Sequence, residues 1–313
     1  MNRPYTPHRG LLVLLGVLAC LPLILPNSFY FDLLIRFAIN AAIAITLNLL
    51  IGYTGQISLG HAGFFGLGGY GSAILISRCG IPPALALVLS ATGVAVLALL
   101  VARPILRLKG HYLAMATLGL GIIIMITLTN ESALTGGPDG MAVPAFTLLG
   151  WEVSGDRTWY AISACTLLLT AWAALNLIAA PGGRALQAIH GSEVAALAVG
   201  IDVAAMKVRV FVLSAVAASV MGSLSAHYVG FITPGIAGFL HSIELVTMVV
   251  LGGMASVFGA ILGAAVITVL PQLLSTLEGW ETVAFGAVLM LCMIFLPKGL
   301  VPTLRARWQR RNA

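Results

Sequence analysis

Ten apolar stretches run through this 313-residue sequence and decide what it can fold into. They cover approximately residues 11–26, 33–51, 61–77, 84–102, 111–129, 158–180, 208–230, 243–255, 258–275 and 282–297. A helix needs about 20 apolar residues to cross a bilayer, because each residue adds about 1.5 Å. Charged residues make up only 8% of the chain, about a third of the usual share in a soluble domain. The sequence therefore predicts an all-α, polytopic bundle of about ten membrane segments, forming one domain over residues 1–313.

The basic residues predict how this bundle is oriented. If the N-terminus lies inside the cell, thirteen of the sixteen lysines and arginines fall on the inner side, and only Arg36, Arg78 and Arg157 fall outside. Basic residues next to membrane helices favour the cytoplasmic side. Both termini and the loop 181–207 are therefore predicted to be cytoplasmic, and the loop 131–157 to lie outside. In this arrangement the basic tail 305–311 meets anionic lipid headgroups, so no nucleic-acid role is expected.

Glycines interrupt two of the apolar regions. Residues 52–71 contain eight glycines, and residues 252–259 separate two apolar halves of about 12 to 18 residues. A glycine weakens a helix by about 1 kcal/mol relative to alanine, so the chain is predicted to unwind or bend at both places. Backbone that is unwound at membrane depth should line a cavity, and paired interruptions of this kind indicate a substrate path. Close helix packing through glycine is the alternative explanation.

Seven residues at these interruptions are candidates for lining a path: Gln56, Ser58, His61, Gly63, Glu244, Gly252 and Gly253. His61 and Glu244 are ionisable groups within the apolar regions, where a charge costs at least about 2.5 kcal/mol. Each has an alternative explanation. His61 is also compatible with a hydrogen-bonded structural role, and Glu244 with a solvated position at the outer interface.

The sequence carries no motif for covalent chemistry. It has no G-x-x-x-x-G-K-[ST] sequence, and none of Lys109, Lys207 and Lys298 follows a glycine, so no P-loop for ATP is expected. HExxH and GxSxG sequences are also missing, which argues against a membrane-embedded enzyme of those classes. We expect no metal or cofactor on this chain. An ion gradient or a partner chain must supply energy, and an ion-coupled carrier would need mid-membrane carboxylates, for which Glu244 is the one candidate.

The inner loop 181–207 contains an amphipathic element. Its apolar residues recur at near-helical spacing between 184 and 200, Ser192 can cap a second helical turn, and Gly200 can end it. Such an element either lies on the lipid surface or docks into a groove of a partner protein. The residues expected to form that contact are Arg184, His190, Glu193, Ala195, Ala196 and Gly200.

Four motifs, in order, resemble one family of transporters. They are LNLLIGYTGQISLGHAGFFGLGGY at 47–70, LTGGPDG at 134–140, GRAL at 183–186 with EVAA-x3-GI at 193–201, and MVVLGGMAS at 248–256. Over about residues 30–300 the chain is similar to the LivM-type permeases of bacterial branched-chain amino acid ABC transporters. The stretch 193–200 resembles the segment that such permeases insert into the ATPase cleft, with one residue more than the commonest spacing.

The resemblance implies a set of partners and a cargo. A LivM-type permease works in the inner membrane with a second, LivH-type permease, two cytoplasmic ATPases that bind ATP and Mg²⁺, and a periplasmic substrate-binding protein. The implied cargo is leucine, isoleucine or valine. Relatives of this family carry urea or short amides, and such a cargo remains the alternative.

Overall fold

The computed structural model describes residues 7–24, 27–148 and 151–274, with the single positions 283, 286, 287, 290, 294, 299–301 and 303. Only scattered positions of the tenth apolar stretch are therefore described, and the basic tail 305–311 lies outside the described part. Twelve α-helices and two 3-10 helices make up the fold in the described residues, and four strands of two residues each occur in loops. The all-α prediction is confirmed.

The helices are α1 Pro7–Ile24, α2 Ser28–Thr54, α3 His61–Cys79, α4 Pro83–Ile105, α5 His111–Asn130, α6 Ser132–Thr135, η1 Gly137–Asp139, α7 Asp156–Ala179, α8 Pro181–Gly191, α9 Glu193–Ala198, α10 Val203–Val229, η2 Pro234–Ala237, α11 Phe239–Gly252 and α12 Val257–Leu274. The strand β1 (Met141–Ala142) pairs antiparallel with β4 (Phe231–Ile232), and β2 (Thr147–Leu148) pairs antiparallel with β3 (Trp151–Glu152).

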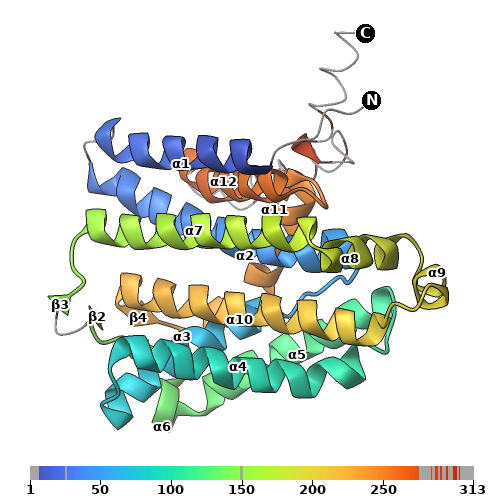
Figure 1. The fold of residues 1–313 in the computed structure, drawn as a ribbon. Helices are drawn as coiled ribbons and strands as arrows, with labels where there is room; N and C mark the ends of the chain where they lie inside the picture. The colour runs from blue at the N-terminus through green and yellow to red at the C-terminus, as the bar shows by residue number, and fades with distance from the viewer. Residues whose placement is uncertain are drawn as a thin grey trace.

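Six of the described helices are long and apolar enough to cross a membrane: α2, α4, α5, α7, α10 and α12. Two shorter apolar helices are Gly10–Pro22, within α1, and α11. The polytopic prediction is therefore confirmed, whereas the predicted total of ten segments is not. Figure 1 shows the long helices running side by side, with β2, β3 and α6 at one end of the bundle and α8 and α9 at the other. The loops predicted to lie on opposite sides of the membrane thus lie at opposite ends of the molecule.

The central helix of the bundle is α2. Every residue of α2 from Ala41 to Thr54 is buried, and α7, α10, α11 and α12 pack around it. The outer helices are different: α4 and α5 expose large apolar side chains such as Leu100, Met115 and Ile123. An apolar surface of this kind is what a lipid environment requires.

The glycine-rich region 52–71 is unwound only in part. Residues 55–60 are not helical, but α3 begins at His61 and runs through Gly63, Gly66, Gly68, Gly69 and Gly71. The prediction of an unwound chain is therefore right for 55–60 and wrong for 52–54, which end α2, and for 61–71. Close packing explains the difference, because a Cβ added to Gly68 would overlap the carbonyl group of Ser219 in α10. Tertiary contacts compensate for the low helix propensity of glycine.

The small residues of α10 form the other half of this contact. Ser214, Ala218, Gly222 and Ala226 recur every four residues and are all buried. A Cβ on Gly222 would overlap the carbonyl group of Phe65, and the hydroxyl of Ser223 donates to that of Ser72 at 2.9 Å. The helices α3 and α10 therefore approach each other to backbone contact, which glycine alone allows at these positions.

Candidate functional site

The second predicted interruption is the short break between α11 and α12, at residues 253–256. Side chains of α2 form hydrogen bonds with the backbone groups of this break. The Asn48 amide accepts from the Ala255 N–H (2.9 Å) and donates to the Ser256 carbonyl (2.8 Å), and the Tyr53 hydroxyl donates to the Ala255 carbonyl (2.8 Å). Freed backbone groups at membrane depth need such partners. Gly252 and Gly253 are themselves buried, and Gly252 packs against the backbone of Gly259.

The polar residues of the first interruption are also enclosed by protein. Gln56, Ser58 and His61 are at most 2% exposed. Ser58 Oγ lies 2.8 Å from His61 Nδ1, and the Gln56 amide donates to Thr54 Oγ1 at 2.8 Å. This geometry supports the structural alternative for His61. Gly63 lies in α3 and packs against Ile124 and Gly121 of α5.

A cavity of about 550 Å³ opens between α2, α10, η2, α11 and α12. This volume falls in the range of about 300–1,000 Å³ that small-molecule sites occupy. Its polar lining consists of Arg36, Asn40, Ser225, Tyr228, Thr233, His241, Glu244 and Thr268. The rest of its lining is apolar apart from Gly235, namely Ile39, Phe65, Ile236, Leu240, Met248, Ile267 and Pro271. Of the seven predicted path residues, Glu244 alone lines this cavity.

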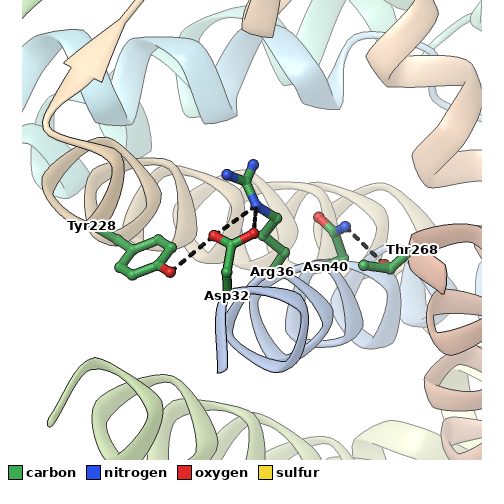
Figure 2. A network of polar contacts seen from close by, with 5 residues as sticks. All are labelled: Asp32, Arg36, Asn40, Tyr228 and Thr268. Carbon is green, nitrogen blue, oxygen red and sulfur yellow. Dashed lines mark hydrogen bonds and ion pairs between the residues drawn. The ribbon is translucent and has the colours of Figure 1, made fainter. Parts of the chain in front are cut away.

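A polar network runs along one wall of the cavity and joins three helices (Figure 2). Arg36 Nε of α2 donates to both carboxylate oxygens of Asp32, at 3.0 and 2.9 Å. The Tyr228 hydroxyl of α10 donates to Asp32 Oδ1 at 2.9 Å. One turn along α2, the Asn40 amide donates to Thr268 Oγ1 of α12 at 3.1 Å. The network fixes Arg36 and Asn40 on the face of α2 that borders the cavity.

Glu244 lies on α11, in another wall of the cavity. Its Oε2 is 3.3 Å from Nδ1 of His241, one turn earlier in the helix, and 43% of the Glu244 side chain is exposed. Sequence reasoning missed Arg36, Asn40 and Tyr228. Arg36 was counted only as a basic residue on the outer side, and Asn40 and Tyr228 stand within apolar stretches without a motif around them. The available signal was the spacing of Arg36 and Asn40, four residues apart and so on one helix face.

The amphipathic inner element forms α8 and α9. Ser192 caps α9 as predicted, with the Ala195 N–H donating to Ser192 Oγ at 3.2 Å. Ile189, Ala196 and Val203 pack together as a small buried cluster. Val194, Leu197 and Val199 are 76%, 59% and 75% exposed. The helix α9 therefore presents an apolar surface with no covering element in the described part of the chain, and we call Val194, Leu197 and Val199 the α9 surface.

This arrangement corrects the expectation for Ala196. Its side chain is 1% exposed, so it shapes the segment from inside and offers no surface to a partner. Ala195 and Gly200 are exposed, as are Arg184 and His190. Gly55, at the start of the first interruption, lies against the His190 ring, so the end of α8 contacts the end of α2.

Glu193, which was expected to contact a partner, forms ion pairs within this chain. Its carboxylate pairs with Lys207 Nζ of α10 at 2.5 Å and with Lys109 Nζ at 3.6 Å, and the Lys207 side chain is only 7% exposed. Desolvation raises the pKa of the Glu193 carboxyl, but the two ammonium groups outweigh it and hold that pKa below its usual value. A carboxyl with a lowered pKa keeps its charge, and its stabilising contact, until the pH falls through that lowered pKa. Removing Glu193 at neutral pH would leave a buried ammonium without its partner, which is costly.

Comparison with known proteins places the chain. Residues 29–297 match the family described as branched-chain amino acid transport system / permease component. The chain belongs to this family. It is 33% identical over 233 residues to the high-affinity branched-chain amino acid transport system permease protein LivM of Escherichia coli, covering 67% of this chain and 55% of that protein. LivM of Salmonella typhimurium is 32% identical over the same extent. The chain therefore spans about half the length of these LivM proteins.

The second permease type of these systems is also similar. LivH of Salmonella typhimurium is 29% identical over 210 residues, which is 64% of this chain and 66% of that protein. No solved structure matches the chain. Family membership and the six apolar helices identify a multi-pass inner-membrane protein of a permease family.

Proposed function

We propose that this chain is one permease subunit of an ATP-driven importer that carries leucine, isoleucine or valine across the bacterial inner membrane. The names of its relatives, which are branched-chain amino acid permeases, support this cargo. In the proposed complex it pairs with a LivH-type permease, receives cargo from a periplasmic binding protein, and is driven by two cytoplasmic ATPases that hold ATP and Mg²⁺. The chain itself catalyses no covalent step.

The observation that carries this proposal is the uncovered α9 surface at the end of the bundle opposite β2 and β3 (Figure 1). A chain without a P-loop needs a contact through which a partner ATPase can move it. Exposed Val194, Leu197 and Val199 on a capped helical turn suit an apolar groove of such a partner. Such an apolar surface on a cytoplasmic loop either lies on the lipid surface or docks into a partner, and the need for a driving ATPase favours the second.

Two contacts would carry movement of this segment into the bundle. Glu193 of α9 pairs with Lys207 near the start of α10, and α10 ends at the cavity, where Ser225 and Tyr228 line it. At the end of α8, the His190 ring lies beside Gly55, which follows α2, and α8 packs against α2. Because a packed helix moves as a rigid element, closure of the ATPases on 183–200 would shift the cavity walls at the far end.

The orientation is a separate proposal, based on the thirteen-to-three split of basic residues. Single cysteines at Asp139 and at Gln187, in a cysteine-free background, are expected to differ in intact cells. A membrane-impermeant thiol reagent should label the first and not the second, because 131–157 faces the periplasm and 181–207 the cytoplasm. Gln187 is chosen because it is exposed. The reverse labelling pattern would overturn the orientation.

Omission of single components tests the function itself. Vesicles that contain this chain, the second permease and both ATPases, supplied with loaded binding protein outside and ATP inside, are expected to accumulate leucine against a gradient. Removal of ATP or of the ATPases should abolish accumulation, since the sequence of this chain contains no P-loop motif. Urea and acetamide serve as alternative cargoes. Leucine accumulation by the chain alone, driven by an ion gradient, would contradict the proposal.

A further inference from the structure

The cavity between α2, α10, η2, α11 and α12 carries two charged side chains of opposite sign among the described residues that line it, Arg36 and Glu244. We propose that this cavity binds a free amino acid, with its α-carboxylate on Arg36 and its α-ammonium on Glu244. The inference rests on the proposed import function and deepens it, because it names the groups that would recognise the cargo inside this chain.

The orientation of Arg36 leaves its terminal nitrogens available to bind a carboxylate. Asp32 engages Nε alone, at 3.0 and 2.9 Å, and the two terminal nitrogens donate to no residue of the described part of the chain. In Figure 2 these nitrogens extend past Asp32 and away from the Tyr228 hydroxyl. The terminal pair of a guanidinium matches the two oxygens of a carboxylate in one plane. The bonds to Asp32 restrict the side chain, so little conformational freedom is lost on binding.

Glu244 supplies the opposite charge. Its Oε2 lies 3.3 Å from Nδ1 of His241, which leaves Oε1 available to accept from an ammonium group. The hydroxyls of Ser225 and Thr233 also border the cavity and can accept further ammonium hydrogens. A charged group in a membrane segment is costly unless it is paired or faces a water-filled cavity. Arg36 is already paired with Asp32 through Nε. A zwitterion would place its carboxylate on the remaining terminal nitrogens of Arg36 and give Glu244 a cationic partner, whereas neutral urea does neither.

The remaining wall suits an aliphatic side chain. Ile39, Ile236 and Met248 line the cavity, and Ile39 and Met248 are otherwise buried. Burying apolar area contributes about 25 cal/mol per Å² to the free energy of binding. A leucine side chain would therefore bind this wall more favourably than a polar side chain would. Methionine adapts to ligands of different shape, which fits a site that accepts leucine, isoleucine and valine alike.

Thermal unfolding of the purified complex, without binding protein, tests the site directly. A ligand that binds the folded state raises the unfolding temperature. Leucine should raise that temperature in the wild-type complex. Leucinamide, which lacks the carboxylate, and 4-methylpentanoate, which lacks the ammonium, should do so only at concentrations roughly ten- to a hundredfold higher, because each loses one charged hydrogen-bonded contact.

Variants assign each contact. In Arg36→Met the advantage of leucine over leucinamide should disappear, and in Glu244→Gln the advantage over 4-methylpentanoate should disappear. Arg36→Lys should keep part of the advantage of leucine over leucinamide, because it keeps the positive charge. The matched controls Arg157→Met and Glu152→Gln remove exposed charges that do not line the cavity, and they should behave as wild type. These ligand ratios are measured within one preparation, so a lower yield of a variant does not affect them.

Two results would overturn the inference: no shift with leucine in the wild-type complex, or unchanged ligand ratios in both Arg36→Met and Glu244→Gln. Either result can occur while ATP-dependent leucine accumulation by the wild-type complex continues, which would leave the proposed function intact. Loss of that accumulation, with urea or acetamide carried in its place, would instead reject the proposed function.

Discussion

Gly222→Ala is expected to prevent stable assembly of the permease, although it adds a single methyl group. The new Cβ would overlap the carbonyl group of Phe65 in α3, and backbone cannot rotate aside as a flexible side chain can. Overpacking usually costs about 1–3 kcal/mol, and occasionally more. Here α3 and α10 would have to separate along their whole contact, so we expect a destabilisation at the upper end of this range. The membrane yield should fall strongly, and the unfolding temperature should be lower.

Gly119→Ala is the matched control. Gly119 lies within α5, and nothing lies within 4 Å of a Cβ built on it. Alanine is the better helix former by about 1 kcal/mol, so yield and unfolding temperature should equal or slightly exceed those of the wild type. Equal stability of the Gly222→Ala and Gly119→Ala variants would contradict the backbone contact between α3 and α10.

Leu197→Arg is expected to remove ATPase recruitment and leucine uptake together. The side chain is 59% exposed in the centre of the α9 surface, so the substitution should not disturb the fold of this chain. In a partner groove, however, it would bury an unpaired charge in place of an apolar anchor. Truncating such a central anchor costs at least about 2 kcal/mol, and a buried unpaired charge costs more. We expect copurified ATPase and uptake to fall by about tenfold or more.

Leu134→Arg makes the same change at an exposed leucine in the loop at the opposite end of the bundle, and ATPase copurification should remain at the wild-type level. Ala196→Arg should act differently from both. Ala196 is buried against Ile189 and Val203, so arginine there should destabilise α8 and α9 themselves. Wild-type recruitment in Leu197→Arg would mean that α9 lies on the lipid surface.

The long helices were predictable from sequence because each is a run of apolar residues flanked by polar or turn-forming ones. The break before Val257 was predictable too, since Gly252 and Gly253 stand inside such a run. The helical conformation of the segment from Gly63 to Gly71 was not predictable from the sequence. Glycine propensity acts within the segment, but the backbone of α10 that stabilises α3 comes from residues far along the chain.

The candidate cavity could not be predicted from the sequence for the same reason. Arg36 and Glu244 lie on α2 and α11, and only the packing of those helices brings them to one cavity. Each residue alone looks like a charge at a membrane boundary. The interruptions were a useful signal for irregular backbone, yet Asn48 and Tyr53 fill one of them with protein hydrogen bonds. Near α9 the amphipathic period was right, but the sequence did not reveal that Ala196 faces inward and Leu197 outward.

The central claim is that a partner ATPase binds this chain through the α9 surface. Crosslinking tests this claim more directly than a transport or ATPase assay does. The chain's four cysteines, Cys20, Cys79, Cys165 and Cys292, are first replaced by alanine in a complex that still takes up leucine. Single cysteines are then placed at Leu197, at Val199 and at Leu134, and the assembled complex is treated with a short bismaleimide. We predict covalent permease–ATPase adducts from positions 197 and 199 and none from position 134. Adducts absent at both 197 and 199 in a complex that still transports leucine would contradict the account.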